Sequence, residues 1–545
     1  MIRFGDVLFT VCIVLIAPFS FAQGLSDQIR INLEKATQEK PHVLGGVFLK
    51  NVGEVYQFYA QRGFEPVWSR EFILTERAYE MRYEIRQSQF DGLKPEDYHL
   101  GVLQASFAKA EQKKKDGGVL SILELTQLEI VLTDAFFELA DDLAIGKVNP
   151  SSLKASWNIP RRSRSVDPST LLIESLAQED LRSGLAKLYP KTVLYAEGKQ
   201  LMRELDEKQK KEPVNWKSIK TDRAFKVGDF NPVISQVRER LAYWGFVPSR
   251  VLEDPKKYDS LLLDRVLDFQ KSKGMTADGV LGTLTLEALN DSPSELVDKI
   301  ALNLERLRWI PDEFFEGEAI FVNIPSFQLI YRSGADTLFS TKVIVGTVKH
   351  QSPVFTAPMS YLVLSPFWNI PPSIARNETI PAIKRNPGYL ERNRIEVVTH
   401  AGNPIAPSAV NWNARPFPYL IRQKPGEDNA LGLVKFMFPN PNNVYLHDTP
   451  AKQLFDREIR AFSHGCIRMQ NPKSFADLLL KNKPEWTSDR IWEAMNQSKE
   501  QIVQLDKKIP VVIIYLTMTL DAKGNPMFSK DVYHRDEEVL SLLRR

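Results

Sequence analysis

Near Ala319 the spacing of the apolar residues changes from one typical of helices to one typical of strands. Upstream, apolar side chains recur at intervals of three and four from Val119 to Leu143, which predicts an amphipathic helix whose stripe packs in a core. Downstream, Ile320, Val322 and Ile324 recur at every second position, which predicts a strand. A chain that keeps the two patterns in separate segments is predicted to be a multidomain α+β protein.

The length and composition agree with several globular domains. The chain has 545 residues, and a domain usually contains about 100–200. Apolar residues make up 43% and charged residues 26%, which excludes collagen-like, intrinsically disordered and polytopic membrane proteins. The net charge is only +3 and no long basic block is present, so we predict no nucleic-acid partner.

The first 22 residues have the pattern of a secretory signal peptide. Arg3 precedes an apolar run from Val7 to Phe19, and Ser20-Phe21-Ala22 supplies a cleavage site with small residues. The run is shorter than the roughly 20 residues that span a bilayer, so we predict export and no transmembrane domain. An uncleaved anchor is the alternative.

Export changes the meaning of the cysteine count. The chain has two cysteines, and Cys12 lies inside the predicted signal peptide. The mature chain then keeps Cys466 alone, in a compartment where disulfides form but no partner exists. Such a thiol is either a buried apolar group or a reactive one.

The helical part divides into two units and a connection. Residues 45–216 are predicted to form a helical scaffold domain, which ends at the charged stretch before Pro213. Residues 228–292 form a three-helix module: Asn231-Pro232 starts its first helix and Thr283 caps its third. Residues 293–317 are predicted to be a helical connection.

Residues 318–540 are predicted to form a β-rich domain. Ile320–Ile324 and Phe327–Tyr331 flank a turn like a hairpin, and Val511–Thr519 is predicted to be a buried strand. Residues 366–443 lack sustained periodicity, which predicts an irregular, lid-like insertion beside a functional site.

The chemistry is predicted to lie where a strand ending at His447 is followed, nineteen residues later, by Cys466. A thiol needs a neighbouring base to act as a nucleophile at neutral pH, and an imidazole can take and return its proton. Gly465 leaves room for backbone N–H groups to bind an oxyanion. The helix predicted to begin at Asn471-Pro472 would favour the thiolate if its N-terminus lies nearby.

Two other interpretations of this cluster are a zinc site and a purely structural role for the histidines. His447, His464 and Cys466 are potential zinc ligands, but no compact ligand pair and no fourth ligand are evident. Either histidine alone could be structural, although the neighbouring cysteine argues against that. We therefore predict no metal and no cofactor.

Two parts of the chain resemble known families. The strings "YLHDT" and "SHGCIRM" are similar to the signature of the L,D-transpeptidase catalytic domain, as are "NIPSFQLIYR", "SPVF", "SPFWNIPPSI" and "IPVVIIYLT". The module resembles the peptidoglycan-binding type 1 domain at Phe269, Gln270, Gly274, Asp278, Gly279, Gly282 and Thr285. The whole arrangement is similar to the large periplasmic L,D-transpeptidases of Gram-negative bacteria.

The resemblance implies a role for each residue of the cluster. Cys466 is the nucleophile and His447 the general base and acid; His464 and Gly465 supply backbone donors and loop geometry. Substrate binding is assigned to Ser463, Tyr445 and Arg468. Arg468 either holds a substrate carboxylate or braces the loop, and the residue that orients His447 is either Asp448 or a backbone carbonyl.

The implied activity is acyl transfer on peptidoglycan stem peptides. The enzyme cleaves the bond between the third residue and D-Ala of a tetrapeptide stem and passes the acyl group to the side-chain amine of another stem, which gives a 3→3 cross-link. The resemblance also implies a wall-associated, periplasmic role in cell shape, acylation by carbapenems, and potential association with other wall-synthesis enzymes. Alternatives are an L,D-carboxypeptidase or amidase, transfer to a lipoprotein lysine, and a non-catalytic wall-binding scaffold.

Overall fold

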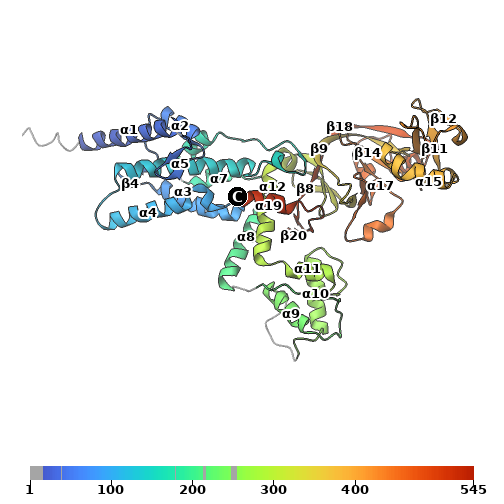
Figure 1. Cartoon of the computed structure of the whole chain (residues 1–545), viewed down its shortest axis with the longest axis horizontal. Helices are drawn as coiled ribbons and strands as arrows, with labels where there is room; N and C mark the ends of the chain where they lie inside the picture. Colours follow the sequence, from blue (N-terminus) through green and yellow to red (C-terminus); the bar gives the residue numbers. More distant parts are fainter. Residues whose placement is uncertain (1–15, 39, 178–179, 213–215, 247–253) are drawn as a thin grey trace, which may run out of the picture.

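The molecule is elongated, with a helical region at one end and a small insertion at the other (Figure 1). The computed structural model describes residues 16–38, 40–177, 180–212, 216–246 and 254–545. Most of the predicted signal peptide, residues 1–15, lies outside them, and helix α1 (Ile16–Gln38) runs through the predicted cleavage point. No helix among the described residues is long and apolar enough to cross a membrane.

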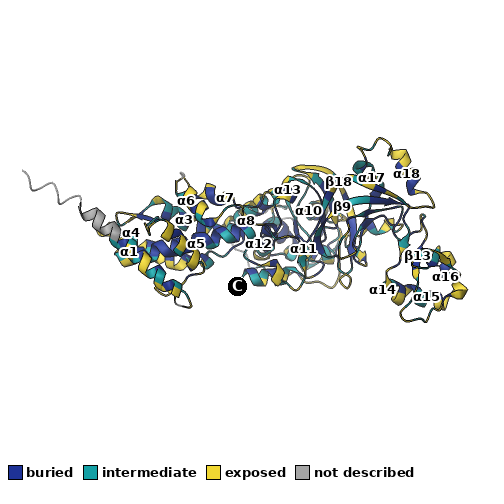
Figure 2. Ribbon diagram, turned by 90° about the horizontal axis from the view of Figure 1, so that it is seen from above, coloured by how far each residue is buried: buried dark blue, intermediate teal, exposed yellow. Residues whose placement is uncertain are grey.

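The helical region is organised around α5 (Ile122–Ile145), the helix predicted from the apolar stripe. A capping box begins it, since Ser121 and Glu124 satisfy each other's backbone N–H groups. Buried residues line the inside of the bundle (Figure 2). The helices packed against α5 are α1, α2 (Val52–Gln61), α3 (Glu76–Gln87), α4 (Leu100–Lys115) and α6 (Pro168–Ala177).

The module consists of α9 (Pro232–Tyr243), α10 (Ser260–Ser272) and α11 (Thr283–Asn290), which enclose a small core of their own. Asn231 caps α9, as predicted. The prediction for the third helix was wrong by one residue: Thr283 is its first residue and Gly282 its N-cap.

Gln270 explains much of the module's sequence signature. Its buried amide donates to Asp278, to the Val280 carbonyl and to the Thr285 hydroxyl, and its Oε1 accepts from the Gly279 N–H. Gly279 has φ +67°, a conformation that favours glycine. These residues therefore stabilise a turn, and their recurrence in the motif needs no ligand.

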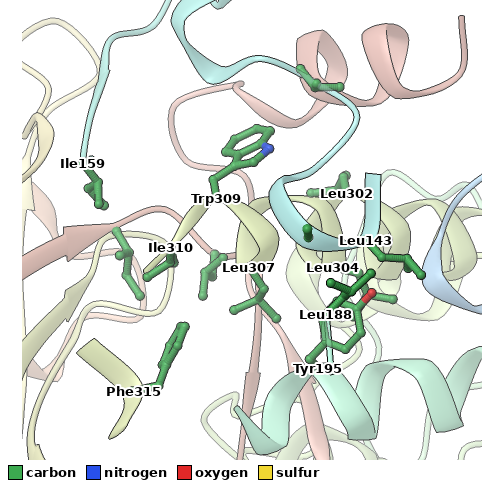
Figure 3. Packing of buried hydrophobic residues seen from close by; sticks show 14 of the residues in the cluster. Leu143, Ile159, Leu188, Tyr195, Leu302, Leu304, Leu307, Trp309, Ile310 and Phe315 are labelled. Atoms are coloured by element: carbon green, nitrogen blue, oxygen red, sulfur yellow. The ribbon is translucent and has the colours of Figure 1, made fainter. Parts of the chain in front are cut away.

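Helix α12 (Pro293–Trp309) lies at the centre of the molecule, although the sequence predicted only a connection there. Eleven of its residues besides Pro293 are buried, because it packs against α5, α8 (Val193–Lys211) and α19 (Asp536–Leu543). Figure 3 shows Leu302, Leu307 and Trp309 of this helix packed between scaffold residues and the β-rich domain. One continuous hydrophobic core thus joins the scaffold to the sheet of the β-rich domain.

The β-rich domain is a ten-stranded sheet that closes on itself. Nine of the strands follow the order β14-β15-β17-β8-β7-β6-β18-β9-β5, and the tenth, β16, pairs with β8 beside this path. Strand β14 also pairs with β9, which makes the sheet barrel-like. The predicted hairpin is confirmed by the antiparallel pairing of β6 and β7. The strands are β5 (Trp157–Asn158), β6 (Glu318–Asn323), β7 (Gln328–Ser333), β8 (Asp336–Gly346), β9 (Val354–Leu364), β14 (Val434–Met437), β15 (Leu446–His447), β16 (Ala461–Ser463), β17 (Ile467–Met469) and β18 (Gln501–Ile514).

The insertion is ordered, so the prediction of an irregular segment was wrong. It forms a four-stranded sheet of β10 (Trp368–Asn369), β13 (Leu420–Gln423), β11 (Ile395–Val398) and β12 (Pro404–Ile405). A short π-helical turn, η4 (Ala375–Thr379), and the helices α15 (Ile380–Arg385) and α16 (Tyr389–Arg392) complete it. Elements of two to six residues are too short to produce the sustained periodicity on which the prediction depended.

Candidate active site

The pairing of two short strands brings the predicted site residues together. Strands β15 and β17 run parallel, with Leu446 opposite Ile467 and His447 opposite Arg468. Leu446 and Ile467 are fully buried in the core. Because side chains alternate along a strand, the residues on either side of this pair face away from the core. Tyr445, His447, Cys466 and Arg468 line one cavity of about 630 Å³, and η4 of the insertion lines its other side.

Cys466 is a half-buried, free thiol in this cavity. Its Sγ lies 3.8 Å from the Asn443 carbonyl oxygen. Burial raises the pKa of the thiol, and this outweighs the lowering by hydrogen bonds from the Tyr445 N–H and hydroxyl and by the charge of Arg468. The predicted helix is present as α17 (Pro472–Leu479), and the balance at the thiol is dominated by desolvation. The resting group is therefore the neutral thiol.

His447 is buried and neutral. Its Nδ1 lies 2.5 Å from the Asp448 carbonyl oxygen, which fixes the proton on Nδ1 and leaves Nε2 as the basic nitrogen. Burial and the charge of Arg468 lower the pKa of His447 to about 3, against the opposing effect of the Asp448 and Leu431 carbonyls. The site thus holds a thiol and a neutral imidazole at pH 7.

The carboxylate of Asp448 does not orient the histidine. It accepts from the Leu433 and Thr449 N–H groups and pairs with Lys452. The backbone carbonyl of Asp448 is the group that binds His447, which is the second of the two alternatives that the sequence left open.

Ser463 and Gly465 shape the turn before the cysteine. The Ser463 hydroxyl donates to the Cys466 carbonyl (2.5 Å) and accepts from the Gly465 N–H (3.1 Å). Gly465 has φ +117°, and its carbonyl accepts from the Ser352 hydroxyl (2.7 Å). The Gly465 N–H is therefore already engaged. In the described part of the chain, the N–H groups of His464 and Cys466 have no acceptor.

His464 faces the insertion. The Nε2 of its exposed ring lies 3.0 Å from the Oε1 of Glu378 in η4, and the ring lies tilted against that of His350, with 5.2 Å between their centroids. This contact joins the turn from Ser463 to Cys466, called the catalytic turn below, to the insertion. Glu378, His350 and Ser352 were not predicted from the sequence. Ser352 could have been found, because it lies in the string "SPVF" that resembles the family, whereas no sequence signal marks Glu378.

Arg468 has a free guanidinium group. Its buried Nε has no hydrogen-bond partner, and no described carboxylate lies within ion-pair distance of it. Burial lowers the pKa of Arg468, although the group stays charged. A half-buried, unpaired cation at a cavity is suited to bind an anionic group of a ligand.

The comparisons with known proteins agree with this geometry. Residues 317–503 match the family model described as "L,D-transpeptidase catalytic domain". The chain carries an L,D-transpeptidase catalytic domain. Residues 231–289 match the model of a "Putative peptidoglycan binding domain", and residues 53–202 match a "Scaffold domain".

A curated protein of Haemophilus influenzae, named "Putative L,D-transpeptidase", is 34% identical over 283 residues. The match covers 51% of this chain and 56% of that protein, so the chain spans little more than half of the relative's length. Two solved L,D-transpeptidase structures are also similar. The one from Xylanimonas cellulosilytica has 11% identity and a TM-score of 0.16, and the match covers 54% of this chain and 99% of that chain. The one from Stackebrandtia nassauensis has 14% identity and a TM-score of 0.20, and the match covers 55% of this chain and 96% of that chain. The assignment of the catalytic domain depends on the sequence match.

The zinc alternative finds no support in the geometry. Within the described ranges, no three His, Cys, Asp or Glu side chains are grouped so that they could hold a metal ion.

Proposed function

We propose that the protein is a peptidoglycan L,D-transpeptidase that uses Cys466 as its nucleophile. The observation that carries the proposal is the shared cavity, in which a neutral thiol, a neutral imidazole and an unpaired guanidinium lie together in a domain of the matching family. This set supplies a nucleophile, a base and an anion-binding group, which is what acyl transfer from a carboxylated peptide requires.

In the first step, His447 Nε2 takes the proton of the Cys466 thiol while the sulfur attacks the carbonyl between the third residue and D-Ala of a tetrapeptide stem. The hydroxyl and N–H of Tyr445 stabilise the developing thiolate. The N–H groups of His464 and Cys466 are the oxyanion donors that the turn leaves available, because that of Gly465 is engaged. The C–N bond then breaks, His447 protonates the departing D-Ala amine, and a thioester remains.

In the second step, the side-chain amine of another stem attacks the thioester. His447 takes a proton from this amine as the new C–N bond forms and the C–S bond breaks, and the proton returns to the sulfur. The product is a 3→3 cross-link, and no external energy source is needed because the thioester conserves the energy of the cleaved amide. The insertion, held to the catalytic turn through Glu378 and His464, covers the cavity and limits access of water.

Arg468 is assigned to a substrate carboxylate and not to bracing the loop, because it bonds no loop atom. Ser463, predicted to bind substrate, is assigned to positioning because both of its hydrogen bonds stabilise the turn. Tyr445, also predicted to bind substrate, is assigned to stabilising the Cys466 thiolate through its hydroxyl and its backbone N–H.

Product analysis tests the proposed function. Purified disaccharide tetrapeptide, incubated with the enzyme and separated by liquid chromatography with mass detection, is expected to give a cross-linked dimer and free D-Ala. Tripeptide as the sole product would contradict transfer and favour an L,D-carboxypeptidase. A peptide that ends in lysine, added as a competing acceptor, tests for transfer to a protein. If the acyl group is transferred only to this peptide and no cross-linked dimer forms, the proposed acceptor is wrong.

Replacing Arg468 by alanine is expected to raise the KM for the tetrapeptide by about 10–100-fold, since a hydrogen bond to a charged group contributes about 1.5–3 kcal/mol. The kcat should change much less, and Arg468→Lys should recover part of the loss. Steady-state kinetics with the soluble muropeptide measure both constants. A bracing role would instead lower the melting temperature and leave the KM unchanged.

A further inference from the structure

A second cleft, of about 660 Å³, lies between the peptidoglycan-binding module and the catalytic domain. It is as large as the active-site cavity, and the reaction proposed above does not use it. Its walls come from α10 and α11, from the segment before β16, and from the end of β20 (Pro526–Phe528), which lies beside the module in Figure 1.

One wall presents a lysine without a counter-ion. Lys273 lies at the C-terminus of α10, with its Nζ 5.6 Å from the ring of Phe269 and 5.7 Å from the ring of Phe528 across the cleft. No described carboxylate is within ion-pair distance of it. Burial lowers the pKa of Lys273, so its charge is poorly satisfied within the fold.

The opposite wall holds three further cations. Lys342 reaches only the Phe455 carbonyl (3.5 Å), and the side chain of Arg457 has no partner among the residues described. Arg460 donates to the carbonyls of Phe327, Val343 and Arg457, which fix its guanidinium without neutralising it. Of the three cations on this wall, Arg460 is therefore held in a fixed position, whereas Lys342 and Arg457 are exposed.

The acidic residues of the cleft do not balance these cations. Glu287 pairs with Lys530, Asp291 with Lys299 and Asp536 with Arg306. Asp531 accepts from the Tyr515 hydroxyl and from two backbone N–H groups. Asp456, Glu458 and Asp531 have no cationic partner among the described residues, and burial raises the pKa of Glu458. Four cations without an ion-pair partner therefore face three such carboxylates.

We propose that this cleft binds a carboxylate-bearing stem peptide of peptidoglycan, as a contact with the wall separate from the active site. The inference rests on the proposed function. Cations on both walls suit a peptide with several carboxylates, and Met275, Leu284 and Phe528 supply apolar contacts for its methyl and methylene groups. One wall belongs to the domain that matches a peptidoglycan-binding model, which favours a stem over other acidic peptides.

The cleft is directly connected to the catalytic turn. The segment from Asp456 to Arg460 lines it and continues into β16, and Cys466 follows Arg460 by six residues. A stem held in the cleft would therefore keep the same wall strand close to the reacting thiol.

Calorimetric titration of disaccharide tetrapeptide into the full chain carrying Cys466→Ala, which cannot consume the ligand, tests the proposal. Two binding events are expected. In the double variant Lys342→Glu/Arg457→Glu, one event should weaken at least tenfold while the other is retained. Both side chains are exposed and bond no side chain, so the fold should persist. The matched control, Lys210→Glu/Lys211→Glu on α8, carries the same charge change and should bind like the parent.

The failures of the two proposals can be told apart. With Cys466 intact, the cleft variant should react with a carbapenem at the parental rate; if the parent itself does not react, the proposed function fails. If the parent reacts but only one binding event is seen, or if the cleft variant keeps both events, the cleft proposal is overturned. Equal binding of an oligo-L-glutamate at the cleft would also overturn the stem as its ligand.

Discussion

Replacing Cys466 by alanine is expected to reduce cross-linking by at least about 10³-fold, the scale on which loss of a nucleophile acts. It should also abolish the covalent adduct that the unmodified protein forms with a carbapenem. Intact-protein mass spectrometry detects that adduct. In a protein that starts after the predicted signal peptide, which contains Cys12, a thiol-derived adduct can be assigned to Cys466 alone.

The same thiol should show an unusual pH dependence. Since burial raises the pKa of Cys466 above its ordinary value, the thiolate fraction is small at neutral pH and rises tenfold per pH unit. Labelling by iodoacetamide, which needs no base, should therefore increase without a plateau up to about pH 9. A plateau near pH 7 would indicate a preformed thiolate. Cys466→Ser should retain the melting temperature while losing the label.

The candidate pair of Cys466 and His447 could be singled out from the sequence, because residue types and spacing are local. The signals were a cysteine left alone by a predicted signal peptide and a histidine at the end of a predicted strand. The register of β15 and β17 could not be predicted, because a parallel pairing is decided by which residues the core buries. In this pairing Leu446 and Ile467 lie opposite each other and are both fully buried in the core.

The net shift of the Cys466 pKa could not be predicted from the sequence, for a related reason. A local pattern can indicate a nearby helix N-terminus or glycine, whereas desolvation depends on everything that the fold brings around the group. Around Cys466 this includes the insertion, whose η4 lies on the far side of the cavity and about 90 residues upstream of it.

The position of α12 between the domains could not be predicted from the sequence either. Its apolar residues predicted a helix, but a periodic stripe does not say which partner will cover it. Because residues 300–309 of α12 are all buried, the scaffold and the catalytic domain share one core. The scaffold is thus part of the platform that holds the sheet, and β5 even adds a strand to it.

Replacing His447 by alanine is expected to slow acylation by a carbapenem at pH 7 by about 10²–10⁴-fold, the usual contribution of a positioned base. The reason is that the thiol is neutral at this pH and another group must remove its proton. Stopped-flow fluorescence or mass spectrometry gives the rate. The matched variant His464→Ala should slow the reaction less than about fivefold, because this exposed ring faces Glu378 and not the thiol.

The pH profiles should separate the two histidines further. The pKa of His447 is lowered to about 3, so the imidazole is already basic over the working range. The unmodified enzyme should therefore react at a nearly constant rate between about pH 5 and 8. In His447→Ala, only the thiolate can attack, so the rate should rise tenfold per pH unit over the same interval. A flat profile in His447→Ala together with a sloping one in His464→Ala would assign the base to His464.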